Sequence, residues 1–250
     1  MGYCHKRYHY LVMPNPRFEY LCCIITLIPL PSKPDAMKRF EVIGLNIMQI
    51  HSLYDVLFAM KPLPEQMRNE LDQKEFIQYV DLKLESSHYV HRQILLNAGQ
   101  IAENIYFLES GFARGYYYNR EKGKEQTVCL WDAASIITEP NSFFKREKSE
   151  LHIEVMPGSR LKSISRQKLT EVYEEFPFAE IFNKCLILQY VSYQTQRTND
   201  LIGLSGWERY LEMLRRYPQI EQKVSKEIIA SYLGITPQSL SRLLKVNGHP

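Results

Sequence analysis

Two short helices joined by a tight turn are predicted near the end of the chain, over residues 225–245 (SKEIIASYLGITPQSLSRLLK). Gly234 falls where the first helix must end, since glycine enters the left-handed conformation at little cost. Thr236 offers an oxygen that can cap the second helix, and Pro237 takes the first helical position, where a missing N–H costs nothing. Small Ala230 allows a close crossing one turn before the glycine. The apolar faces consist of Ile228, Ile229, Leu233, Leu240, Leu243 and Leu244. This combination predicts a helix-turn-helix.

The outward face of the second predicted helix carries side chains that suit DNA. They are Thr236, Gln238, Ser239, Ser241, Arg242 and Lys245. Arginine can read guanine through a two-pronged hydrogen bond, and glutamine can do the same for adenine. Hydroxyls and lysine suit phosphate oxygens, which position a protein on the duplex without reading its sequence. These side chains predict a DNA-recognition helix, and the alternative is an ordinary helical hairpin with a polar face.

The charge distribution favours the DNA-binding interpretation. Residues 205–250 carry seven Lys and Arg against four Asp and Glu, a balance of +3, whereas residues 38–204 have a balance of −2. A basic C-terminal region on a slightly acidic body is typical of a DNA reader with a separate sensory or scaffolding domain.

Residues 225–245 resemble the helix-turn-helix of the Crp/Fnr family of bacterial transcription regulators. The segment SYLGITPQSLSRL is especially similar to the form in members that lack a well-formed cyclic-nucleotide pocket. With the upstream segments described below, the resemblance covers residues 48–246. It implies that Gln238 and Arg242 read bases, whereas Pro237 stands where many members have a base-contacting side chain.

The resemblance also implies an α+β fold and a domain order. Residues 1–47 form an N-terminal extension, and residues 48–177 form a cyclic-nucleotide-binding-like β-roll (a jelly roll) with flanking helices. Residues 178–204 form a long dimerisation helix and hinge, and residues 205–250 form a winged-type helix-turn-helix, although little chain is left for a wing. The implied partners are double-stranded DNA, a second copy of the chain and RNA polymerase.

The pattern of residues 87–165 fits the β-roll. Short alternating apolar runs are separated by turn residues, which predicts an antiparallel barrel or jelly roll. The runs are HYVHRQILL, ENIYFLES, GFARGYYYN, EQTVCLWDA, ELHIEV and SRLKSIS. Residues 51–84 read instead as two helices separated by Pro62 and Pro64, with apolar stripes made of Leu53, Val56, Leu57 and Met60 and of Met67, Leu71 and Ile77.

Residues 135–154 (SIITEPNSFFKREKSELHIE) decide whether the β-roll binds a ligand. In this family a cyclic-AMP pocket needs a short helix facing the phosphate, a Gly-Glu pair, and an arginine before a small residue. Here no glycine occurs between Gly123 and Gly158, Glu139 precedes a proline, and the best match to the arginine is Lys148, before Ser149. We expect a vestigial pocket and no cofactor. The alternative is a regulator responsive to a cyclic nucleotide or other small ligand, held by Glu139, Lys148 and Ser149.

Residues 178–202 contain no Pro or Gly and predict one long amphipathic helix. Its stripe consists of Phe178, Ile181, Phe182, Cys185, Leu188, Val191 or Ser192, and Thr195. We expect this helix to pair with its copy in a homodimer, and the alternative is a helix that lies on its own barrel. GLSG at 203–206 then acts as a hinge. The next helix is expected to bury Trp207, Tyr210, Leu211 and Leu214 and to turn Arg209, Arg215 and Arg216 outward, available to phosphates.

Residues 1–36 differ from the rest in holding five prolines and the apolar run LCCIITLIPL, which is too short to span a bilayer. We expect residues 1–47 to be disordered or to result from a translation start placed too early, and a membrane-touching arm is the alternative. Five cysteines without C-x-x-C spacing indicate free thiols and a cytoplasmic protein. No nucleophile motif, phosphate loop or metal-ligand spacing occurs, so an enzyme is not expected.

Overall fold

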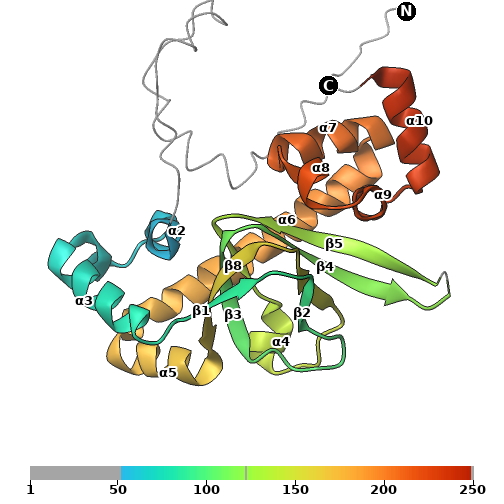
Figure 1. Ribbon diagram of the computed structural model, residues 1–250. Coiled ribbons are helices and arrows are strands. Elements are labelled where there is room, and N and C mark those ends of the chain that lie inside the picture. The colour runs from blue at the N-terminus through green and yellow to red at the C-terminus, as the bar shows by residue number, and fades with distance from the viewer. Residues whose placement is uncertain (1–51, 122, 249–250) are drawn as a thin grey trace, which may run out of the picture. The chain divides into compact units, whose positions relative to one another are not determined.

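The computed structural model describes residues 52–121 and 123–248 (Figure 1). Residues 49–250 belong to one compact unit, and the predictions for residues 1–47 lie outside the described residues. The described chain combines helices with antiparallel sheets, which confirms the predicted α+β class.

The described residues begin with three short helical elements, α2 (Leu53–Ala59), η2 (Glu65–Arg68) and α3 (Glu70–Asp81). Leu57 and Met67 are buried, as predicted. The prediction for Leu71 is wrong, because this side chain is 72% exposed and Phe76 and Val80 form the buried side of α3. Five residues turn an α-helix by about 140° beyond one full circle, so Leu71 and Phe76 cannot share a face.

Eight strands are described, and they form two four-stranded antiparallel sheets. Their bounds are β1 (Glu85–Tyr89), β2 (Gln93–Leu96), β3 (Asn104–Ser110), β4 (Phe112–Asn119), β5 (Lys124–Asp132), β6 (Ser135–Ile137), β7 (His152–Val155) and β8 (Ser159–Ser165). The strand orders are β1-β8-β3-β6 and β2-β7-β4-β5, which confirms the jelly roll. The run HYVHRQILL is not one strand: it holds the end of β1 and all of β2, which belong to different sheets.

The sheet β2-β7-β4-β5 buries side chains on both faces. Ala113, Ile153 and Val155 belong to a core shared with the N-terminal helices and α6, whereas Phe112 and Met156 belong to a second core formed with the C-terminal helices. Because neighbouring residues of a strand point to opposite faces, this one sheet contacts both groups of helices.

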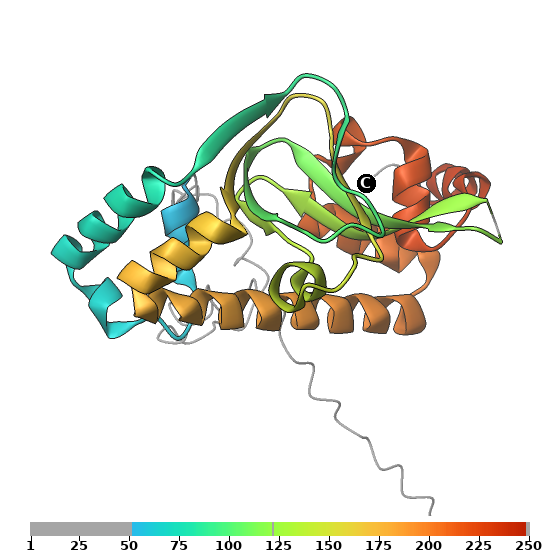
Figure 2. The same ribbon diagram turned by 90° about the horizontal axis from the view of Figure 1, so that it is seen from below.

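Helices α4 (Pro140–Lys145) and α5 (Arg166–Glu175) and the short η3 (Pro177–Glu180) precede α6 (Ile181–Gly203), a single unbroken helix (Figure 2). The residues of the predicted apolar stripe on α6 do not all lie on one face. Phe182 and Cys185 are buried against the β-roll core, whereas Leu188 is 63% exposed and Val191 is 53% exposed. Each three-residue step falls about 60° short of a full turn, so a stripe built on such steps moves around the helix.

The chain then forms α7 (Gly206–Arg216), α8 (Ile220–Lys223), α9 (Lys226–Leu233) and α10 (Pro237–Asn247). Ser205 and Glu208 complete a capping box at the start of α7. Tyr210 is fully buried, as predicted, but the prediction for Leu211 is wrong, because it is exposed and Met213 is buried instead. Within residues 205–248 no strand is described, so the predicted wing has no counterpart there.

Candidate nucleic-acid interface

The turn between α9 and α10 has the predicted geometry. Gly234 adopts the left-handed conformation, with φ 68° and ψ 28°, and its N–H donates to the carbonyl oxygens of Ala230 and Ser231. The Thr236 hydroxyl oxygen accepts a hydrogen bond from the N–H of Ser239 at 3.1 Å, and Pro237 occupies the first turn of α10. These local interactions end one helix and start the next within three residues.

Apolar packing orients the two helices. Ile228, Ile229, Ala230 and Leu233 of α9 and Leu240 of α10 are all buried in one core, as predicted. The predicted apolar residues Leu243 and Leu244 are only partly buried. The opposite side of α10 therefore faces solvent.

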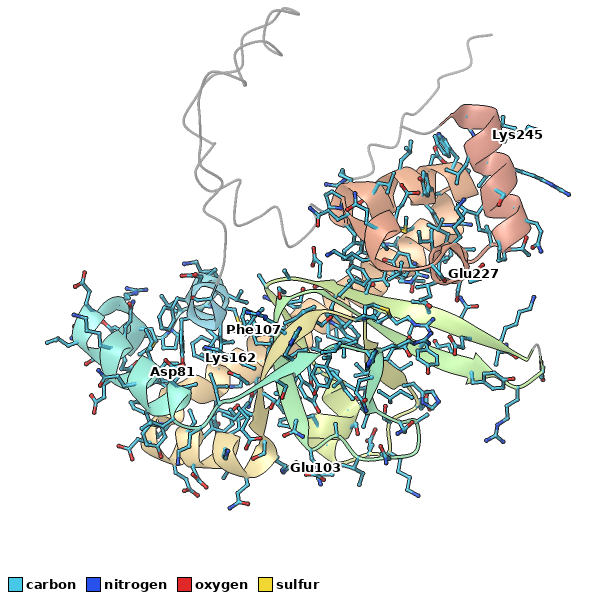
Figure 3. The ribbon with its side chains drawn as sticks, viewed as in Figure 1. Asp81, Glu103, Phe107, Lys162, Glu227 and Lys245 are labelled. Carbon is cyan, nitrogen blue, oxygen red and sulfur yellow. The ribbon has the colours of Figure 1, made fainter. Side chains whose placement is uncertain are left out.

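Three of the predicted DNA-contacting side chains are unpartnered on that solvent side. Gln238, Arg242 and Lys245 are exposed, and their side chains make no hydrogen bond or ion pair within the described part of the chain. Lys245 lies at the outer side of α10 (Figure 3). A helix that presents amide, guanidinium and ammonium groups to solvent can bind the base edges and phosphates of a duplex.

The hydroxyl-bearing members of the predicted set already have intramolecular contacts. Thr236 and Ser239 hydrogen bond to each other at 3.0 Å as part of the cap, and the Ser241 hydroxyl donates to the carbonyl oxygen of Pro237 at 3.0 Å. Each hydroxyl oxygen still has a free lone pair, but its direction is fixed by the hydrogen bond it makes within the helix. These hydroxyls therefore suit contacts that position the helix and do not read bases.

Arg209 and Arg216 of α7 are not free, which corrects their predicted role, whereas Arg215 is exposed, as predicted, and pairs with Glu212. The Arg216 side chain is only 10% exposed and pairs with Asp200 and Glu212, each at 2.8 Å. Arg209 donates to the carbonyl oxygens of Leu233 at 2.9 Å and Leu204 at 2.5 Å. Sequence spacing alone could not reveal these partners, because all but Glu212 lie outside α7.

Two exposed lysines that were not among the predicted site residues flank the start of α9. Lys223 ends α8 and Lys226 begins α9. Exposed lysines at the start of the first helix of a helix-turn-helix are suited to phosphate contacts. Their position next to the N-cap residue Ser225 is the sequence signal that could have identified them.

Two of the three residues predicted to hold a ligand, Glu139 and Ser149, form hydrogen bonds within the chain instead. Glu139 is buried and caps α4, accepting a hydrogen bond from the N–H of Ser142 at 2.5 Å. Burial raises the pKa of the Glu139 carboxyl, and hydrogen bonds from backbone N–H groups partly oppose that rise. Ser149 is buried and its hydroxyl donates to the carbonyl oxygen of Leu151 at 2.8 Å, whereas Lys148 is exposed. Glu139 and Ser149 therefore both use their polar groups within the chain, and the predicted cation Lys148 lies on the surface.

The inside of the β-roll is filled near Gly115. A methyl group on this residue would lie 3.2 Å from the ring of Trp131 and 3.2 Å from Cys129. Burial raises the pKa of the Cys129 thiol to about 12, so this cysteine stays protonated at neutral pH.

Residues 52–121 and 123–248 hold no group of three or more His, Cys, Asp and Glu side chains that could bind a metal. No helix in the same residues is sufficiently long and apolar to cross a bilayer.

Comparison with solved structures identifies the fold. The chain is similar to the global regulator CLP of Xanthomonas campestris, with 15% identity over 70% of this chain and 91% of that one and a TM-score of 0.57. It is also similar to a protein from Eubacterium rectale described as a transcriptional regulator of the Crp/Fnr family (19% identity, 74% and 88% of the two chains, TM-score 0.56). FixK2 from Bradyrhizobium japonicum gives 18% identity, 66% and 86% coverage and a TM-score of 0.55.

No protein-family model and no curated protein matches the sequence. At identities of 15–19% the structural likeness establishes the fold, which is that of Crp/Fnr-type regulators.

Proposed function

We propose that this protein is a sequence-specific DNA-binding transcription regulator of the Crp/Fnr type and not an enzyme. The observation that carries the proposal is the exposed, unpartnered set Gln238, Arg242 and Lys245 on a helix whose entry turn is fixed by Gly234 and Thr236. Gln238 and Arg242 are the base-reading residues, and Thr236, Ser239, Ser241 and Lys245 position the helix on phosphates. The described part of the chain shows no other exposed helix face with this chemistry joined to a helix-turn-helix.

The proposed active form is a homodimer paired through α6. Six exposed residues follow a repeat of four and three along this helix: Lys184, Leu188, Val191, Thr195, Thr198 and Ile202. Alternating steps of four and three are the spacing of a two-stranded coiled-coil seam. Leu188, Val191 and Ile202 are 63%, 53% and 82% exposed, so pairing removes this apolar surface from water.

The symmetry of such a dimer defines its DNA target. Two α10 helices related by a two-fold axis require a pseudo-palindromic operator, with half-sites about one helical turn apart. The partners are double-stranded DNA, the second copy and RNA polymerase, and the protein acts in the cytoplasm.

The β-roll in this proposal does not require cyclic AMP. Glu139 and Ser149 use their polar groups within the chain, and Lys148 is exposed next to Glu150. The second candidate is a ligand-responsive regulator, favoured by the burial of Glu139 and Ser149 beside α4 and by the likeness to CLP, which is described as responsive to c-di-GMP.

Selection of bound duplexes from a random pool tests the proposal. We expect a pseudo-palindromic consensus, obtained equally with no nucleotide, with cyclic AMP and with c-di-GMP. Absence of any consensus at moderate ionic strength contradicts DNA reading, whereas a consensus that needs one nucleotide supports the second candidate.

A further inference from the structure

The C-terminus of α9 is held from three sides. The last carbonyl groups of an α-helix have no partner within the helix and need donors from elsewhere. The carbonyl oxygen of Ser231, which also accepts from the Gly234 N–H, accepts from the Gln126 amide of β5 at 2.8 Å. Arg197 of α6 donates to the carbonyl oxygen of Tyr232, and Arg209 of α7 donates to that of Leu233 at 2.9 Å. We call Gln126, Arg197 and Arg209 the carbonyl clamp.

We propose that the carbonyl clamp positions the recognition helix, so that the β-roll and α6 set the orientation of α10 directly. This inference rests on the proposed function, because it assigns positioning residues to that DNA site. The clamped carbonyls belong to residues 231–233, Gly234 follows at once, and α10 begins at Pro237. A change in direction at the end of α9 is therefore transmitted to α10 through a turn of only three residues.

The chemistry of the clamp makes it strong. Two of its three donors are guanidinium groups at the negative end of a helix dipole, where cations are favourable. Arg197 is 5% exposed and its guanidinium also lies over the ring of Tyr232, 3.8 Å from the centroid. A buried carbonyl that loses its donor pays the cost of desolvation without compensation.

The side chain of Ser231 reinforces the contact with β5. Its hydroxyl oxygen accepts from the N–H of Thr127 at 2.8 Å and donates to the carbonyl oxygen of Glu125 at 2.9 Å. A helix residue thus hydrogen bonds to the main chain of a sheet strand, in addition to the contact made by Gln126.

The contacted part of β5 is itself anchored. Arg114, which is 1% exposed, donates to the Thr127 hydroxyl oxygen at 3.1 Å and to the Glu154 carboxylate at 2.5 Å, and it also pairs with Glu125. A chain of polar contacts therefore runs from β7 through β4 and β5 to α9, buried at Glu154 and Arg114 and partly exposed at Ser231. It connects the sheet to the helix that precedes the recognition helix, separately from the chain connection at residues 203–206.

The clamp can be tested with two variants and matched controls. Gln126→Ala removes one donor and Arg197→Gln replaces the guanidinium by a shorter, uncharged amide, whereas Gln222→Ala and Arg120→Gln change exposed residues of the same types outside the clamp. The first measurement is hydrogen–deuterium exchange of the full chain without DNA. Loss of one hydrogen bond should speed exchange in residues 234–244 about two- to tenfold, with no change in the controls.

The second measurement is the affinity for duplexes whose two selected half-sites are separated by different numbers of base pairs. We expect the wild-type protein and the controls to prefer one spacing. The clamp variants should bind all spacings within about threefold of one another, while their affinity for an isolated half-site changes less than about threefold.

The outcomes separate the two proposals. Unchanged exchange in Gln126→Ala and Arg197→Gln refutes the clamp whether or not the protein binds DNA. Faster exchange with an unaltered spacing preference also refutes it, because the contacts would then be structural only. Absence of duplex preference in the wild-type protein removes the proposed function and with it the assignment of positioning residues. If Arg197→Gln does not fold, Gln126→Ala decides, since it leaves both guanidinium contacts in place.

Discussion

Replacing Arg242 with alanine is the most direct test of base reading. The guanidinium is exposed on α10 and makes no hydrogen bond or ion pair with other described residues. A surface substitution of this kind changes the free energy of unfolding by about 0.5 kcal/mol or less. The variant therefore isolates what Arg242 contributes to DNA binding, without a change in the fold.

The expected loss follows from the contact that an arginine makes with guanine. A two-pronged hydrogen bond to one base is worth about 1–3 kcal/mol of discrimination, or roughly a 5- to 150-fold change in the dissociation constant. Fluorescence anisotropy on the selected operator, and on duplexes with each base pair changed in turn, measures this. We expect Arg242→Ala to lose affinity for the operator and to become indifferent at one base pair.

Two comparisons define what would refute this reasoning. Lys245→Ala, which removes an exposed cation from the same helix, should weaken all duplexes alike and lower the salt slope by about one. Arg120→Ala removes an exposed arginine outside α10 and should leave base preference unchanged. If Arg242→Ala weakens random and operator DNA equally, Arg242 contacts phosphate and the assignment of a reading role is wrong.

Three further perturbations test other parts of the structure. Leu188→Glu places a charge in the exposed seam of α6 and should give monomers in sedimentation velocity; an unchanged dimer refutes pairing through this helix. Arg114→Met removes one of the two arginines paired with the buried Glu154 carboxylate, Arg92 being the other, and should lower the free energy of unfolding in urea by about 1.5–3 kcal/mol; Arg114→Met with Glu154→Leu should lose less than the sum of the two single variants, and additive losses would contradict the pairing. Calorimetry with cyclic AMP should give no binding isotherm at micromolar concentrations, and a clear isotherm would favour the ligand-responsive alternative.

The helix-turn-helix could be predicted from sequence because its determinants are local. Gly234, Thr236 and Pro237 each act on backbone groups within a few residues of themselves. Their chemistry is the same in any chain, so a short sequence window contains all the information needed. The jelly roll was predictable for a related reason, since turn residues and alternating runs mark each strand separately.

The errors arose where a long-range contact decides the outcome. Arg209 and Arg216 look like outward cations in the sequence of α7, but Leu233 and Asp200 lie close to them only in the folded chain. Leu211 and Met213 are both apolar, and packing against α9 and α10 decides which is buried. The spacing of apolar residues predicts that a helix has a buried face, but it does not predict which element packs against that face.

The predicted stripe on α6 failed for a reason that matters for mechanism. The residues described as one dimer face belong to two faces, one buried on the β-roll through Phe182 and Cys185 and one exposed at Leu188 and Val191. The buried face bears out the reading of a helix on its own barrel, and the exposed face is the one that the proposed dimer would use.

The two faces of α6 also connect the proposed dimer to the proposed clamp. Arg197, which holds the carbonyl of Tyr232, lies between Thr195 and Thr198 of the exposed seam. Residues 181–202 contain no Pro or Gly, and α6 is a single unbroken helix. If its seam pairs with a second copy, a change in that pairing must carry Arg197 with it. As long as that bond holds, the C-terminus of α9 follows, and in the proposed dimer the spacing of the two recognition helices changes with it. Because Gln126 reaches the same helix end from β5, the sheet and the proposed dimer seam would act on one point.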